Sequence, residues 1–204
     1  MALQTSVRNH VGDVRSGETL DRLAAERVST DPAPPGLRHG SRKAFLEGMR
    51  QVASSVTVVT TDGPAGRYGA TVSAFSSVSA DPPTVLVCLR SDSRICSAVR
   101  LNRVFTVSVL TEQLGEVART FAGEFDTTLA DRFDGIGIEP LAGLAPGIQG
   151  TSIFACTVAE LIESHTHTIL LGHVVHVATA RHPPLLYHCA AYRGIRPGEG
   201  FKSA

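Results

Sequence analysis

The stretch Val56–Leu89, VTVVTTDGPAGRYGATVSAFSSVSADPPTVLVCL, decides the fold class of this chain. It begins with a β-branched run at 56–61, typical of a strand, which ends at the turn residues 62–64. Residues 68–75 read as a second strand that fits a hairpin with the first. A third, apolar strand at 85–89 is entered through Asp81-Pro82-Pro83. The stretch therefore predicts three consecutive strands.

The rest of the chain adds more strands than helices. Residues 104–110 form an apolar strand, and residues 154–162 and 168–178 form two long antiparallel strands joined by a polar turn at 163–166. Helices are expected after Ser41, after Asp92 or Ser93, and over residues 112–122, where apolar residues recur at helical spacing. Six or more strands with few helices favour an antiparallel sheet closed on itself, because closure removes unpaired edges. The predicted fold class is mainly β, an antiparallel β-barrel with a few flanking helices.

The two ends of the chain differ from its middle. Charged and small residues dominate residues 1–40, and the run Asp31–Gly36, DPAPPG, ends any helix begun before it. We interpret residues 1–40 as a flexible N-terminal extension, with a regulatory or partner-binding tail as the alternative. Residues 41–195 are then one domain of a size that can bury its own core, and residues 196–204 are a C-terminal tail.

Composition excludes several classes of function. Nineteen basic residues balance nineteen acidic ones without a basic cluster, so neither nucleic acid nor a membrane surface is an expected partner. The four cysteines are too widely spaced for a zinc site or a disulfide framework. The start has no apolar core for a signal peptide, and no apolar run approaches the ~18 residues of a membrane span. The expected location is the cytoplasm.

Familiar nucleotide and hydrolase motifs are missing from the sequence. It has no G-x-G-x-x-G after a strand, no phosphate-binding G-x-x-x-x-G-K-[ST] loop and no G-x-S-x-G elbow. A nucleotide cofactor must therefore be held by another kind of site. The pair His165-x-His167 would share one face of a strand, but Leu171 and Gly172 stand where a metal-binding barrel would place a glutamate. No metal is expected.

The segment Gly69–Ser79, GATVSAFSSVS, carries the most specific chemical signal. It is rich in serine and threonine hydroxyls, which alternate with apolar residues, and it carries no charge. A flavin ring is planar and largely apolar, with nitrogen and oxygen atoms on its edge that need donors and acceptors. The segment suits such a ring. Taken alone, it equally suits a Ser/Thr-rich strand whose hydroxyls bond to backbone or water.

The neighbourhood of this segment resembles the flavin reductase family. The family's core reads V-T-V-V-T-T, then G-x-T-x-[NS]-[AS]-F-x-S-V-S-x-D-P-P, then a strand ending in C-[LV], as residues 56–61, 69–83 and 85–89 do here. The likeness resumes at 102–105, 113–123, 132–133, 167–172, 184–187 and Tyr192. It spans roughly residues 44–192.

The resemblance implies a fold and an activity. Members of the family are split β-barrel homodimers that bind FMN or FAD and reduce it with NADH or NADPH. The reduced flavin often passes to a separate monooxygenase or halogenase. Hydride transfer between stacked rings asks the protein chiefly for alignment and polarity, which agrees with a motif of hydroxyls and backbone groups.

The resemblance also implies the residues of the cofactor site. Residues at the matching positions would contact the isoalloxazine and ribityl chain: Thr71, Val72, Ser73 and Ala74, with Ser77 and Ser79 close by. The flavin phosphate would be bound by Cys88, Leu89, Arg90, Ser91, Asp92, Ser93 and Arg94. Phe121, Ala122 and Tyr192 would form the pocket wall. A loop that enters a helix at Ser93 also makes physical sense for phosphate, because a helix N-terminus attracts anions. Tyr192 either covers the nicotinamide side of the pocket or packs in the core.

Two departures from the family pattern leave alternatives open. His167 matches a histidine near the nicotinamide in a Gly-Asp-His turn, but His165 and Thr166 replace the glycine and aspartate. Ser108 stands where the family usually has asparagine. We predict an NAD(P)H:flavin oxidoreductase with His167 as the catalytic candidate. The alternative is a flavin- or heme-binding barrel without turnover.

Overall fold

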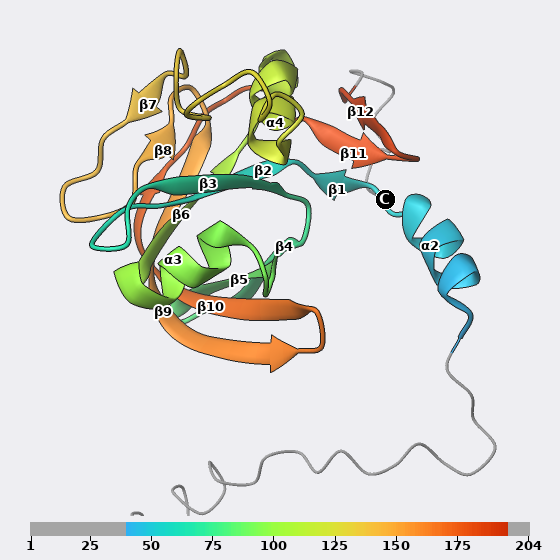
Figure 1. The fold of residues 1–204 in the computed structure, drawn as a ribbon, viewed down its shortest axis with the longest axis horizontal. Helices are drawn as coiled ribbons and strands as arrows, with labels where there is room; N and C mark the ends of the chain where they lie inside the picture. Colours follow the sequence, from blue (N-terminus) through green and yellow to red (C-terminus); the bar gives the residue numbers. More distant parts are fainter. Residues whose placement is uncertain (1–39, 196–204) are drawn as a thin grey trace, which may run out of the picture. The chain divides into compact units, whose positions relative to one another are not determined.

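The computed structural model describes residues 40–195 (Figure 1). The predicted N-terminal extension, except Gly40, and the predicted C-terminal tail lie outside the described residues. The first helix, α2 (Arg42–Arg50), begins directly after Ser41 as predicted. Its apolar side chains Phe45, Leu46 and Met49 are exposed in the single chain. The backbone oxygen of Arg50 accepts a hydrogen bond from the Cys189 nitrogen, at 3.0 Å.

Seven antiparallel strands form the main sheet, in the order β3-β2-β6-β9-β10-β5-β4. Their bounds are β2 Thr57–Thr61, β3 Tyr68–Val72, β4 Phe75–Ala80, β5 Pro83–Arg90, β6 Val104–Val109, β9 Ser152–Ser164 and β10 His167–Ala178. The two edge strands, β3 and β4, are consecutive in the chain and are separated only by Ser73 and Ala74. The sheet therefore curls round until its edges meet at these two residues. This confirms the predicted fold class, an antiparallel split β-barrel.

The barrel interior is filled by the alternating apolar residues that the sequence displays. In β5, Val85, Val87 and Leu89 are buried while the residues between them are not. They pack with Val59, Phe105 and Leu170 from β2, β6 and β10 in one core. β2 is buried along its whole length, and its threonine hydroxyls donate to backbone oxygens, as Thr57 does to Val72 at 2.7 Å. The β-branched run thus lies at the centre of the fold.

Two of the helices within residues 40–195 cover the barrel. Helix α3 (Arg94–Asn102) has Ser93 as its N-cap, whose hydroxyl accepts from the Cys96 nitrogen at 3.3 Å, and it buries Ile95 and Val99. The helix predicted at 112–122 is a 3₁₀ turn, η1 (Glu112–Leu114), followed by α4 (Gly115–Ala122). Phe121 of α4 packs with Val56, Leu110 and Phe133 in a second core. None of the helices within residues 40–195 is long and apolar enough to cross a membrane.

The structure corrects the strand predicted at 68–75. That segment is two strands, because the chain leaves β3 at Ser73 and enters β4 at Phe75 on the opposite edge of the sheet. Several short strands were also missed, because two or three residues give no periodic signal: β1 (Ser54–Ser55), β7 (Ile138–Glu139), β8 (Gly147–Ile148), β11 (Leu186–His188) and β12 (Ala191–Arg193).

Candidate functional site

The junction between β3 and β4 places the centre of the hydroxyl-rich segment on the surface. Ser73 and Ala74 are exposed, and the Ala74 oxygen accepts from the Cys88 nitrogen on β5 at 3.1 Å. The Thr71 hydroxyl donates to the Ala118 oxygen of α4 at 2.6 Å. Val72 is 8% exposed and belongs to the core, so only its backbone is available to a ligand. The junction therefore offers a ligand backbone groups and the exposed Ser73 hydroxyl, and it carries no charged side chain.

A hollow of about 540 Å³ opens beside this junction. Four of the predicted site residues line it: Thr71, Ser73, Ala122 and Tyr192. The other lining residues are Val56, Arg119, Glu124, Tyr187, Ala190 and Ala191. A volume of this size is typical of a site for a small molecule.

The wall of this hollow combines two aromatic rings with one ion pair. The rings of Tyr187 and Tyr192 meet edge to face with centroids 5.7 Å apart. Burial, and next the Glu124 carboxylate, raises the pKa of Tyr192. Glu124 also accepts from Arg119 Nε at 2.7 Å. Tyr192 thus lines the hollow and also packs on the second core; its predicted place over a nicotinamide stays a prediction.

Phe121, a predicted site residue, lines neither hollow and packs in the second core. Its side chain is 1% exposed and meets Phe133 edge to face, with ring centroids 5.0 Å apart. Gly69 of β3 lets the ring approach, because a Cβ there would lie 2.4 Å from it. Arg132 donates to the Phe121 oxygen at 2.9 Å and pairs with Asp126. Phe121 therefore fixes α4 against β3.

The segment Cys88–Arg94, predicted for phosphate, spans the end of β5, the loop Ser91–Ser93 and the first residue of α3. Leu89 is buried in the core, and burial raises the pKa of the half-buried Cys88 thiol. Arg90 and Asp92 form an exposed ion pair at 2.7 Å, which lowers the pKa of the Asp92 carboxyl. A second hollow, of about 320 Å³, lies beside this loop and is lined by Ala65, Tyr68, Asp92, Arg94, Ser97, Ala98 and Leu101. Tyr68 begins β3 and Thr71 nears its end, so the two hollows lie toward opposite ends of one strand.

His167 lies next to the loop Ser91–Ser93, which is predicted to bind phosphate. It opens β10 opposite Arg90 of β5, and its charge contributes to lowering the pKa of Asp92. The side chain is exposed, and its Nδ1 lies 2.9 Å from the Thr166 hydroxyl. The Ser91 nitrogen donates to the Thr166 oxygen at 3.0 Å, which holds the loop and the turn together. The fold thus joins a histidine and a loop that are far apart in the sequence.

Other predicted residues stand apart from the hollows. Ser77 and Ser79 are exposed on β4, and the Ser79 hydroxyl bonds to the backbone of Asp81. Ser108 is fully buried, and its hydroxyl accepts from the Ile148 nitrogen at 2.9 Å. The serine at this position therefore anchors β8.

Sequence reasoning missed six of the lining residues: Val56, Arg119, Glu124, Tyr187, Ala190 and Ala191. Arg119 and Glu124 lie at the end of an amphipathic helix, where charged residues are ordinary. Tyr187 and the two alanines belong to the β11–β12 hairpin. No local pattern indicated that this hairpin would line a hollow with α4.

The sequence model of the flavin reductase like domain matches residues 49–196. The chain belongs to the flavin reductase family. It is 38% identical over 145 residues to a relative from Methylorubrum extorquens named FMN reductase (NADH) RutF 2, covering 71% of this chain and 80% of the relative. It is 34% identical over 137 residues to the 4-hydroxyphenylacetate 3-monooxygenase reductase component of Pseudomonas aeruginosa, covering 64% of this chain and 77% of the relative.

The solved structures agree with this family. The Streptomyces globisporus C-1027 protein SgcE6, described as an NADH:FAD oxidoreductase, superposes with a TM-score of 0.70 at 29% identity. The superposition covers 80% of this chain and 99% of SgcE6. The likeness extends to the split-barrel fold.

Proposed function

We propose that this protein is an NAD(P)H-dependent flavin reductase that transfers hydride from a nicotinamide to FMN or FAD. The observation that carries the proposal is the β3–β4 junction, an uncharged hydroxyl and backbone edge beside a hollow of about 540 Å³. Its residues fit a flavin ring, because the ring edge needs neutral donors and acceptors while its faces need apolar and aromatic surface. Membership in the flavin reductase family supports the same assignment.

Each part of the site has a distinct task in this proposal. Thr71, Ser73 and the backbone of Val72 and Ala74 hold the ring at the junction. The free N–H groups at the start of α3, with Ser93 and Arg94, take the flavin phosphate. A nicotinamide and a flavin held here would supply the hydride chemistry, with flavin N5 as the acceptor. The chain therefore binds, orients and excludes water, and it needs no acid–base pair.

His167 orients the nicotinamide in this proposal. Its pairing opposite Arg90 and the contact of its Nδ1 with the Thr166 hydroxyl set its place beside the loop Ser91–Ser93. An exposed imidazole there has a free face for the carboxamide or phosphates of the dinucleotide. Replacing His167 with glutamine is expected to raise KM for NADH about tenfold, the scale of one hydrogen bond to a charged group, with flavin affinity unchanged.

NADH is the expected coenzyme. Arg119 is the basic side chain among the described residues that line the larger hollow, and Glu124 already pairs with it. A 2′-phosphate needs an arginine whose charge is available to it, whereas a carboxylate suits a ribose 2′-hydroxyl. The name of the Methylorubrum relative, FMN reductase (NADH), points the same way.

A second copy of the chain and an oxygenase are the proposed partners. In the single chain, apolar side chains are exposed on α2, where Phe45 is 64% exposed, and on β10, where Val175 is 54% exposed. Such patches on a small domain favour burial in an oligomer, and the family resemblance implies a homodimer. The Pseudomonas relative is named as the reductase component of a monooxygenase. Reduced flavin is therefore proposed to pass to a separate monooxygenase or halogenase.

The test is oxidation of NADH and NADPH, followed at 340 nm, with FMN, FAD or no added flavin. Turnover that requires added flavin and is faster with NADH supports the proposal. Absence of turnover with every pair contradicts it and favours a binding protein without catalysis. Light scattering on the eluting protein, with Phe45→Ser as the variant, tests the dimer. A monomeric parent protein would contradict that part.

A further inference from the structure

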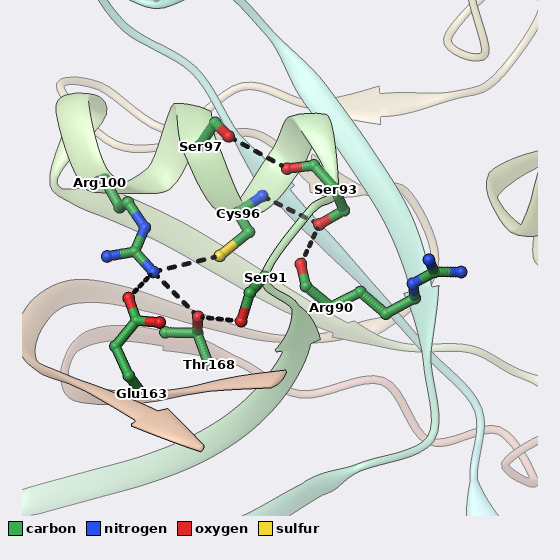
Figure 2. A network of polar contacts seen from close by, with 8 residues as sticks. All are labelled: Arg90, Ser91, Ser93, Cys96, Ser97, Arg100, Glu163 and Thr168. Atoms are coloured by element: carbon green, nitrogen blue, oxygen red, sulfur yellow. Dashed lines mark hydrogen bonds and ion pairs between the residues drawn. The ribbon is translucent and has the colours of Figure 1, made fainter. Parts of the chain in front are cut away.

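A polar network ties the phosphate loop to the His167 turn through the far end of α3 (Figure 2). Arg100 Nη2 donates to Glu163 Oε1 at 2.5 Å and to Thr168 Oγ1 at 2.9 Å. The Thr168 hydroxyl in turn lies 2.9 Å from the Ser91 hydroxyl. A single guanidinium therefore bridges the strands on either side of the turn and is linked to the loop before α3 through Thr168.

Thr168 is the centre of this network. Its side chain is fully buried, and its hydroxyl bridges Arg100 on one side and Ser91 on the other. The same loop and turn also meet through the backbone, where the Ser91 nitrogen donates to the Thr166 oxygen at 3.0 Å. Ser91 is thus held at both its backbone and its hydroxyl.

The loop end held in this way leads directly into the start of α3. Ser91 stands two residues before Ser93, whose hydroxyl donates to the Arg90 oxygen at 2.7 Å and accepts from the Cys96 nitrogen at 3.3 Å. An anion at a helix N-terminus is bound by N–H groups whose direction decides the strength of the bond. A loop that is already ordered avoids the entropic cost of ordering on binding.

We propose that Arg100 and Thr168 are positioning residues that hold the loop Ser91–Ser93 in its anion-binding form. The proposal rests on the proposed function, which assigns the flavin 5′-phosphate to this loop. Neither residue contacts the ligand. They act through Ser91, so their loss weakens ligands that carry the phosphate and spares ligands that lack it.

The test compares FMN with riboflavin, which lacks the phosphate. Dissociation constants are measured from the quenching of flavin fluorescence with the full chain, without NADH. Thr168→Val removes the bridging hydroxyl at nearly constant volume, and Thr168→Ser keeps it as the matched control. We expect Thr168→Val to weaken FMN about tenfold and riboflavin less than about twofold, a loss on the scale of one or two hydrogen bonds. Thr168→Ser should keep the parent ratio.

Two more variants guard against a folding defect at the buried threonine. Glu163→Gln removes the charge that pairs with Arg100, and Arg100→Met removes the donor while keeping an apolar stem; both positions are partly exposed. Selective loss of FMN affinity in these variants supports the proposal. Equal loss for both ligands, or no loss, overturns it. A parent protein that does not prefer FMN to riboflavin also overturns it.

Failure of this inference and failure of the proposed function are separable. Selective loss of FMN binding in a protein that does not oxidise NADH supports the role of Arg100 and overturns the reductase. NADH oxidation by the parent, together with variants that keep the parent ratio of FMN to riboflavin affinity, supports the reductase and overturns the role of Arg100 and Thr168.

Discussion

Replacing Gly69 with alanine tests the packing that fixes α4 on β3. The added Cβ would lie 2.4 and 2.6 Å from two carbons of the Phe121 ring and 3.2 Å from Phe133. Ordinary contact needs at least about 3.4 Å, so the ring must move by about 1 Å. It cannot move freely, because it is 1% exposed and packed against Phe133.

The expected cost follows from this geometry. Overpacking in a closed core destabilises the folded state by about 1–3 kcal/mol. Alanine also lowers the conformational entropy of the unfolded chain relative to glycine, which stabilises the protein by about 0.4–1 kcal/mol. We therefore expect Gly69→Ala to lower the free energy of unfolding by about 1–2 kcal/mol. For a domain of this size, the melting temperature should fall by about 2–8 °C.

Urea unfolding followed by circular dichroism measures this change. The midpoint should fall while the slope with urea stays constant, because the surface exposed on unfolding is unchanged. Gly115→Ala is the matched control, since Gly115 has helical dihedrals and nothing within 4 Å of an added Cβ. That control should be as stable as the parent, or more stable by up to about 1 kcal/mol. If Gly69→Ala behaves like Gly115→Ala, the close contact between Phe121 and β3 is wrong.

Three further predictions address electrostatics, thiol chemistry and the ligand site. Arg132 lowers the pKa of Asp126 below its ordinary 3.8, so the stability that Asp126 contributes is present above about pH 4 and lost as pH falls through the lower folded-state value. The parent should thus exceed Asp126→Asn in free energy of unfolding by at most about 1 kcal/mol at pH 6, and by less at pH 3. Urea unfolding measures both values, and a difference that does not change with pH contradicts the prediction. Burial raises the pKa of Cys156 to about 12, so iodoacetamide at pH 8 should modify the exposed Cys189 orders of magnitude faster, as peptide mass spectrometry would show. Ser73→Asp should weaken FMN binding about tenfold or more at an unchanged melting temperature, because it places an unpaired charge against the ring. Ser76→Asp, at an exposed position of β4, is the control. Equal FMN affinity in the two variants refutes the placement of the ring.

The sequence by itself determined the class of fold and the positions of several strands and helix starts. Local pattern is sufficient for these features. The strand at 57–61 is indicated by its β-branched residues and the strand at 85–89 by its apolar residues, while Ser93 caps α3 through a contact only three residues away. The hydroxyl-rich segment was singled out through the family resemblance, because its own pattern equally suited an ordinary Ser/Thr-rich strand. What pattern could not determine was that Ser73 and Ala74 join the two edges of the sheet.

Only the tertiary structure decided which distant side chains share the site. Arg119 and Glu124 meet Tyr187 and Tyr192 because the β11–β12 hairpin lies beside α4, and no periodicity in either segment encodes that approach. The bridge from Arg100 to Ser91 likewise depends on the register of β10 against β5, which places Thr168 opposite Leu89. Barrel closure sets such contacts, and closure is a property of the whole sheet; a short stretch of sequence specifies a strand but not the strand that lies across from it.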